Sequence, residues 1–357
     1  MNITFLLGNG LDRALGLETG YNEFYEWYCN KSREGLTEPV SKFRTEIDKY
    51  IHNDSSAEAY WSDAEYGLGQ YTEKFSIETV NDFLDCFDDF RDNLVEYLKE
   101  QEYLIDKNLA GQMRSTIAPQ LLDFYQEIDP IERYVIKDLM YREKAVNSNV
   151  NFICFNYTNS IDKIVISLKQ EMLGAWRGSD GNTHKLLMGE LVHAHGTLEQ
   201  WPIIGVCNIK NIKNQELLKD NIFKVVMQKG ESIKVSGQLW RNRAKEILNN
   251  STVICVFGMS LGDTDSDYWE MLTEWLDEDA KRHLIVFWYN TKFKNTNMSV
   301  REKYQEVNSV KERLFEFSSW TSEIFEKISN RIHVVIKPQK MFMLPEEQKA
   351  NQKQKVK

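Results

Sequence analysis

The most informative segment of this sequence is NVNFICFNYTNSID, residues 149–162. Its first half, Val150–Phe155, is a short and almost wholly apolar run bounded by polar residues, which is typical of a strand buried on both faces. The polar residues Asn156–Asn159 end this strand, and a helical pattern with Ser160 as its N-cap follows. Polar side chains in this position lie where open α/β sheets bind ligands, although an ordinary capped turn explains them equally well.

The same alternation of short apolar runs and helical patterns recurs along the chain. The expected strands are 3–7, 150–155, 191–195, 202–206, 251–257, 284–289 and 331–336. Strands that alternate with helices favour parallel pairing, because each helix carries the chain back across the sheet. We therefore predict an α/β fold with a doubly wound, mainly parallel, Rossmann-like sheet.

Residues 32–149 have mostly helical patterns, so we expect a large helical insertion there within a single domain spanning residues 1–344. Within it, the glycine-punctuated aromatic residues 60–71 are expected to form a loop, as are residues 174–182 further along the chain. Residues 345–357 are polar and rich in Lys and Gln, which predicts a disordered tail.

Composition narrows the class of protein. The chain has 357 residues and a net charge of −10, which disfavours a broad nucleic-acid or anionic-membrane surface. Its five cysteines are scattered without a C-x-x-C pair, as expected in a reducing cytoplasm rather than in a disulfide framework. The sequence has no signal-peptide pattern and no apolar run near the ~20 residues of a membrane helix.

Glycines follow the first expected strand. Gly8-Asn9-Gly10-Leu11-Asp12 lies between that strand and a short helical pattern, where glycines allow a backbone to approach a phosphate or ribose. The segment is not a complete G-x-G-x-x-G fingerprint, because position 13 is Arg, and a tight turn explains it about as well. Asp12 is harder to explain as a turn residue and is a candidate ligand for a ribose hydroxyl.

Two further strand ends carry polar groups. His193 and His195 should point to the same face of their strand, because alternate residues do, and Gly196 should end it. The strand at 251–257 is followed by Gly258, Ser260, Asp263 and Asp265. We expect these sets to converge on one ligand site.

Taken together, these motifs resemble those of the bacteriophage abortive-infection AbiH family. The resemblance rests on LGNGLD at 7–12, FNYTN at 155–159, HAHG at 193–196 and GMSLGDTDSDYW at 258–269, in the family's order. Leu11 stands where that family usually has Phe. The resemblance implies an anti-phage abortive-infection effector.

The family's motifs in turn are similar to those of sirtuin-like NAD-binding domains. That likeness implies catalytic roles for Asn156, which would position the nucleophile near the nicotinamide ribose, and for His195, which would act as base. The residues that it implies in NAD binding are Gly8, Asn9, Gly10, Asp12, Thr158, His193, Gly196, Gly258, Ser260, Asp263 and Asp265. The implied activity is hydrolysis of the nicotinamide–ribose bond of NAD or a related nucleotide, with NAD as substrate or ligand and no metal. Paired zinc-ribbon cysteines are absent, so a protein deacetylase is disfavoured.

Three alternatives remain open. Gly258–Gly262 spells the G-x-S-x-G nucleophile elbow of α/β-hydrolases, with Ser260, Asp277 or Asp279, and His333 in a plausible order. His193 and His195 with the acids after Gly262 are candidate ligands of a metal-dependent nuclease. The same cleft could also serve as a nucleotide sensor without turnover. Partners compatible with these interpretations are NAD or a related nucleotide, a phage-derived trigger or partner protein, and a second copy of the chain; a membrane partner is not expected and nucleic acid is disfavoured.

Overall fold

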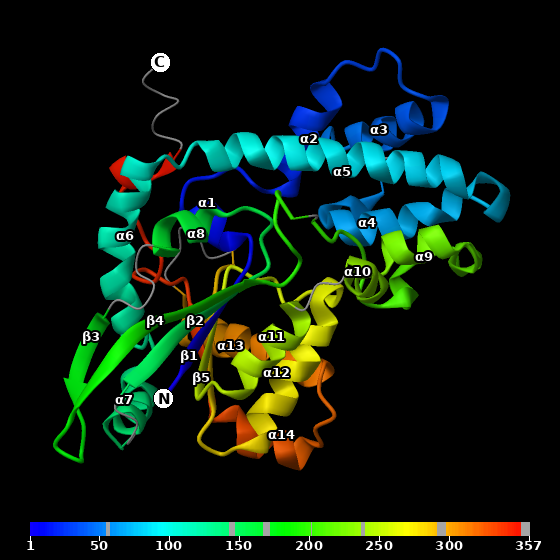
Figure 1. Ribbon diagram of the computed structural model, residues 1–357. Helices are drawn as coiled ribbons and strands as arrows, with labels where there is room; N and C mark the ends of the chain where they lie inside the picture. The colour runs from blue at the N-terminus through cyan, green and yellow to red at the C-terminus, as the bar shows by residue number, and fades with distance from the viewer. Residues whose placement is uncertain are drawn as a thin grey trace.

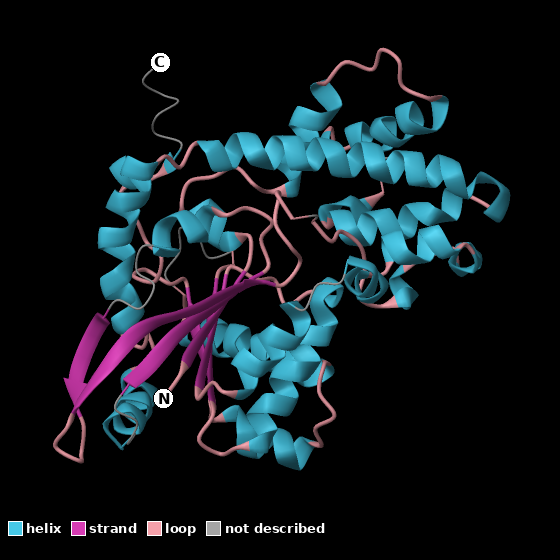
Figure 2. Ribbon diagram, in the orientation of Figure 1, coloured by secondary structure: helices cyan, strands magenta, loops and turns pink. Residues whose placement is uncertain are grey.

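The computed structural model describes residues 1–54, 58–142, 147–166, 172–200, 202–236, 240–290 and 298–350. A seven-stranded sheet with the order β3-β4-β2-β1-β5-β6-β7 runs through them, parallel except for the β3–β4 pair at one edge (Figures 1 and 2). The strands are β1 (Ile3–Leu7), β2 (Asn147–Cys154), β3 (Met172–Arg177), β4 (Thr183–His193), β5 (Val253–Phe257), β6 (His283–Trp288) and β7 (Ile332–Ile336). Without β3, this is the Rossmann strand order, in which the chain builds outward from β1 in both directions.

Helices cover both faces of the sheet, which confirms the predicted doubly wound α/β fold. Alternate residues of β1 point to opposite faces, so that Ile3, Phe5 and Leu7 belong to one core and Leu6 to the other. The first core is closed by α1 (Gly10–Ala14), α6 (Lys107–Leu122), α7 (Pro130–Arg142) and α8 (Ser160–Val165). The second is closed by α11 (Trp240–Asn249), α12 (Ser266–Glu278), α13 (Val300–Glu316) and α14 (Ser322–Ser329).

A third core lies beyond the carboxyl ends of the strands and is mainly helical. It is formed by α2 (Tyr21–Asn30), α3 (Glu38–Ile51), α4 (Ala64–Tyr71), α5 (Val80–Tyr103) and α9 (Asn221–Met227), with α10 (Lys229–Ser236) beside them. We call this part the helical layer. The α5 helix runs across the top of Figure 1 and joins the helical layer to the sheet. At about 1.5 Å per residue its 24 residues span about 36 Å, which is enough to cross a domain.

The division of the chain differs from a single insertion over 32–149. The helical layer draws on residues from Tyr21 to Leu98 and also on residues 198–227, whereas α6 and α7 pack on the sheet. The tail also differs from the expectation of disorder: residues Glu346–Gln348 form a 3-10 helix, and the backbone amide of the buried Ala350 donates to Leu15 O. Residues 351–357 lie outside the described part of the chain.

Three local predictions were wrong. The expected strand at 202–206 is reduced to one bridge between Val206 and Gln228, because its apolar residues pack in the helical layer. The expected loop at 60–71 contains α4, which Asp63 caps by accepting from the backbone amides of Glu65 and Tyr66. The expected loop at 174–182 is only partly a loop: residues 174–177 belong to β3, and residues 178–182 form the turn that leads to β4.

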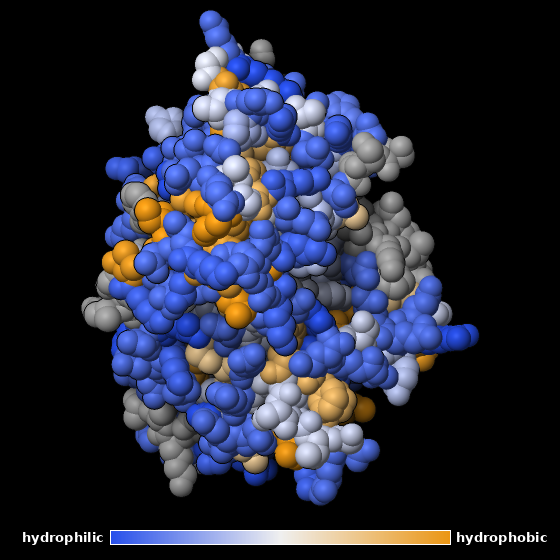
Figure 3. Space-filling model, turned by 90° about the vertical axis from the view of Figure 1, so that its right-hand side faces the viewer, coloured by the Kyte–Doolittle hydropathy of each residue, from blue (hydrophilic) through white to orange (hydrophobic). Residues whose placement is uncertain are grey.

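The face of the molecule on the right-hand side of Figure 1 is mainly hydrophilic, with a group of apolar side chains in its upper half (Figure 3). None of the described helices is both long and apolar enough to cross a membrane.

Candidate functional site

The register of the sheet brings four strand ends to one edge. Leu7 at the end of β1 pairs with Cys154 of β2 and with Phe257 of β5, and Cys154 pairs with His193 of β4. Because these strands are parallel, the loops that follow them all leave the sheet at this edge. The helical layer lies over the same edge (Figure 1).

A cavity of about 520 Å³ lies between these loops and the helical layer. Its volume falls in the range of small-molecule and cofactor sites. It lies where the strand order reverses, with β2 on one side of β1 and β5 on the other. Doubly wound sheets bind nucleotides at this position. The predicted site residues that line it are Gly8, Asn9, Gly10, Asp12, Asn156, Thr158, His195, Gly258, Ser260 and Asp265.

Three predicted site residues do not line this cavity. Asp263 forms an ion pair with Arg313 at 2.8 Å and is largely exposed. His193 ends β4 and contacts Asp162, whereas His195 lies beyond the strand, contacts Asp265 and lines the cavity, so the two histidines have different surroundings. Gly196 follows in a turn with a φ of +76°, a conformation that favours glycine.

The glycines after β1 and β5 pack directly against each other. A Cβ on Gly10 would lie 2.4 Å from Gly258 Cα, and Gly258 itself has a φ of +72°. The backbone amide of Gly8 donates to Phe257 O at 3.0 Å, and that of Gly10 to Gly258 O at 2.9 Å. The amides of Gly8 and Gly10 are therefore engaged within the protein, and these glycines allow the close contact of the two loops.

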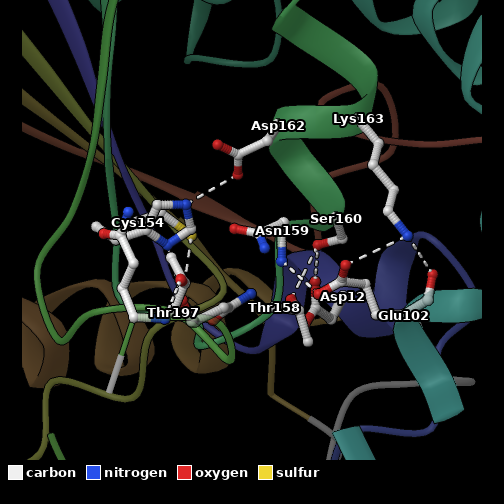
Figure 4. Close-up of polar contacts among 12 residues, drawn as sticks. Asp12, Glu102, Cys154, Thr158, Asn159, Ser160, Asp162, Lys163 and Thr197 are labelled. Carbon is white, nitrogen blue, oxygen red and sulfur yellow. Dashed lines mark hydrogen bonds and ion pairs between the residues drawn. The ribbon is translucent and has the colours of Figure 1, made fainter. Parts of the chain in front are cut away.

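Asp12 joins the first loop to the second. Its buried carboxylate accepts hydrogen bonds from the hydroxyls of Thr158, at 2.7 Å, and Ser160 (Figure 4). Burial raises the pKa of Asp12 to about 6, against the opposing effect of these hydrogen bonds. Both carboxylate oxygens already have partners, so Asp12 fixes the geometry of the cavity floor.

Asn156 is the buried amide of this site. Its buried side-chain Nδ2 has no hydrogen-bond partner of normal geometry. The amide lies near enough to Asp12 to lower the pKa of that carboxyl, against the larger effect of burial. Its backbone oxygen lies 3.0 Å from His193 Nδ1, while His193 Nε2 lies 2.8 Å from Asp162 Oδ2. Both ring nitrogens of His193 thus face acceptors. Burial opposes the charged imidazole, but Cys154 and Asp162 outweigh it and raise the pKa of His193.

His195 has the opposite electrostatic character. Its Nε2 lies 3.3 Å from Asp265 Oδ1, and its ring packs edge-on against Phe155. Burial, and then the nearby Lys229 ammonium, lower the pKa of His195 to about 3, although Asp265 acts in the other direction. The imidazole is therefore neutral at neutral pH.

Three charged residues of the cavity were not found from the sequence: Asp63, which is the N-cap of α4, and the pair Glu65 and Lys229. Lys229, at the start of α10, is 2% exposed and lies 2.8 Å from Glu65 Oε2 of α4 and 3.1 Å from Asp265 Oδ1. Burial, together with the charge of Asp265, raises the pKa of Glu65 to about 7 despite Lys229. The Tyr157 hydroxyl lies 3.0 Å from Glu65 Oε1. No local pattern marks Glu65 or Lys229, because each belongs to an ordinary helix.

The family described as bacteriophage abortive infection AbiH matches residues 4–289 of this chain. The chain belongs to the AbiH family. The matched region contains all four motif groups and every strand that contributes a loop to the cavity. Family membership indicates a role in abortive infection by bacteriophage. No curated protein was found to match the chain.

In this AbiH protein the serine-hydrolase alternative lacks its triad. Ser260 lines the cavity, whereas His333 does not. His333 instead lies 3.0 Å from His283 and 3.1 Å from Glu132, which also do not line the cavity. The metal-dependent nuclease alternative also lacks a ligand set: within the described ranges, no three His, Cys, Asp or Glu side chains gather closely enough to hold a metal ion.

Proposed function

We propose that this AbiH protein hydrolyses the bond between nicotinamide and ribose in NAD or a related nucleotide, and that the reaction takes place in the cavity at the β1/β5 strand ends. One observation carries the proposal. Asn156, with an unpartnered amide, and His195, with a neutral imidazole, line the same cavity at the nucleotide-binding position of a Rossmann-ordered sheet. The likeness of the motifs to sirtuin-like NAD-binding domains supports these two roles.

The charges of the cavity favour this chemistry. Among the described residues, those that line it include four acids, Asp12, Asp63, Glu65 and Asp265, and one ammonium group, that of Lys229. Cleavage of a nicotinamide–ribose bond places positive charge on the ribose ring as the bond breaks. Carboxylates that are already fixed around the reacting sugar stabilise such a charge without further reorganisation.

The reaction balances without a metal or redox partner. The bond between ribose C1′ and the nicotinamide nitrogen breaks, and its electron pair leaves with neutral nicotinamide. The oxygen of a water molecule forms the new bond to C1′, and one proton is released. In the proposal Asn156 orients this water or a ribose hydroxyl, and His195 accepts the proton.

The test is release of free nicotinamide from NAD by the purified protein, with any phage-derived trigger supplied. We expect release by wild type and its loss in Asn156→Ala. A Ser62→Ala variant is the matched control, because Ser62 lines the same cavity but has no assigned role in binding or in the proposed step. Absence of release under conditions in which the protein is toxic to cells would overturn the proposal.

A second candidate is a nucleotide sensor that binds without turnover. It is favoured by the low pKa of His195, about 3, because an imidazole with that pKa is a weak base. Calorimetric binding of NAD that is lost in Asn156→Ala, with no nicotinamide released by wild type, would support the sensor over the hydrolase.

A further inference from the structure

A buried ion network joins the helical layer to the sheet beside the proposed catalytic histidine. The Lys229 ammonium contacts Glu65 Oε2 at 2.8 Å, Asp265 Oδ1 at 3.1 Å and Thr264 O at 3.2 Å. These three acceptors match the three donors of an ammonium group. The network thus links α4 and α10 of the helical layer to the loop after β5.

Lys229 and His195 share one oxygen atom. Asp265 Oδ1, which contacts Lys229, also lies 3.3 Å from His195 Nε2. The other groups around the His195 ring are aromatic: Phe155, Tyr157 and Tyr268. Burial is the largest cause of the lowered pKa of His195, and among the described residues Asp265 and Lys229 are the charged groups that act on it in addition.

We infer that Lys229 is a positioning residue. Held by α10 and by Glu65 of α4, it neutralises Asp265 and thereby keeps His195 uncharged and weakly basic. The catalytic consequence of this inference rests on the proposed function, whereas the effect on His195 does not. An enzyme that destroys NAD has to be silent until it is needed, and a weakly basic His195 is one means of silencing it. Since Lys229 and Glu65 belong to the helical layer, separation of Lys229 from Asp265 by that layer would change the charge beside His195.

A count of charges predicts the outcome of substitution. In wild type the network holds Glu65 and Asp265 with one ammonium, and His195 is neutral. In Glu65→Gln, Asp265 and Lys229 still balance, so His195 stays neutral. In the double variant Glu65→Gln/Lys229→Gln, Asp265 has no other cation, and His195 becomes its partner. The two variants differ only at Lys229, so Glu65→Gln is the matched control.

The experiment is a pH titration of ¹³C-labelled histidine by NMR in the full-length protein without NAD. Only six histidines are present, and the His195 signal is identified by its loss in His195→Gln. We expect a His195 pKa of about 3 in wild type, no higher in Glu65→Gln, and above the ordinary ~6.5 in the double variant. A His195 that stays neutral at pH 5 in the double variant would overturn the inference.

A second variant covers the case in which the double variant does not fold. Asp265→Asn keeps the Glu65–Lys229 pair but removes the carboxylate beside His195, so His195 must remain neutral. A pKa of ~6.5 or above in Asp265→Asn would contradict the inference. Turnover of NAD is measured separately: the expected shift of His195 without any turnover upholds the inference and refutes the proposed hydrolase, whereas turnover without the shift does the reverse.

Discussion

Replacing Gly258 by alanine tests the contact on which the cavity depends. Gly258 has a φ of +72°, and a Cβ there would lie 2.7 Å from both Gly10 Cα and Leu11 N. These are backbone atoms of the loop after β1, so no flexible side chain can move aside. The substitution must either strain the backbone at this position or push the two loops apart.

The expected cost has two parts. A non-glycine residue in the left-handed region costs about 1–2 kcal/mol. Overpacking against fixed neighbours costs a further amount of about 1–3 kcal/mol. The sum, about 2–5 kcal/mol, is a large share of the stability of a typical protein, which is about 5–15 kcal/mol.

Two alanine variants separate these contributions. Gly35 has a φ of +79° with no atom within 4 Å of an added Cβ, so Gly35→Ala should cost only the backbone part. Gly111 lies inside α6 with the same open space, so Gly111→Ala should stabilise by about 0.5–1 kcal/mol. The assay is urea-induced unfolding of the three variants and wild type. A Gly258→Ala cost no greater than that of Gly35→Ala would refute the close packing of the two loops.

The remaining predictions concern the buried charges. The pKa of Asp12 is raised to about 6 in the folded protein, so its contribution to stability is full below its unfolded pKa of about 4 and is lost as the pH rises to about 6. Over that range the unfolding free energy of wild type should fall by up to about 3 kcal/mol relative to that of Asp12→Asn. The same pH dependence of unfolding in the two proteins would contradict this prediction. The buried Arg44 donates to Asp89 from Nε at 3.1 Å and from Nη2 at 2.7 Å, and Asp89→Asn removes this carboxylate. The unfolding free energy should therefore fall by about 3 kcal/mol or more. A loss below about 1 kcal/mol by denaturant titration would argue against a buried pair. His195→Ala should lower nicotinamide release by about 100-fold or more, and full activity would remove His195 from the proposed step.

The strands that carry the site were predictable because they are buried on both faces. β1 and β5 are nearly continuous apolar runs followed by glycine, and the second half of β2, from Val150 to Cys154, is apolar except for Asn151. The β3–β4 hairpin was missed because glycines are typical of loops: Gly174 lies within β3, and Gly178 and Gly181 lie in the turn that follows it. Residues 202–206 were wrongly predicted to form a strand, because they are apolar; these side chains pack in the core of the helical layer instead.

The site residues at the strand ends were predictable in the same way, whereas those of the helical layer were not. The sequence placed Gly10, Asn156, His195 and Ser260 at strand ends, and parallel pairing was enough to bring these ends together around one cavity. Lys229 was beyond reach, because its partners Glu65 and Asp265 come from distant helices and loops that meet only when the helical layer closes over the sheet. Pairings of this kind depend on tertiary structure and leave no local pattern.

The most direct test of the central proposal is mass spectrometry of nucleotides in cells that express this protein under conditions that activate it. Wild type should deplete NAD and accumulate ADP-ribose with nicotinamide, whereas Asn156→Ala at equal abundance should leave NAD unchanged. Growth arrest by wild type with NAD at its normal level would contradict the account.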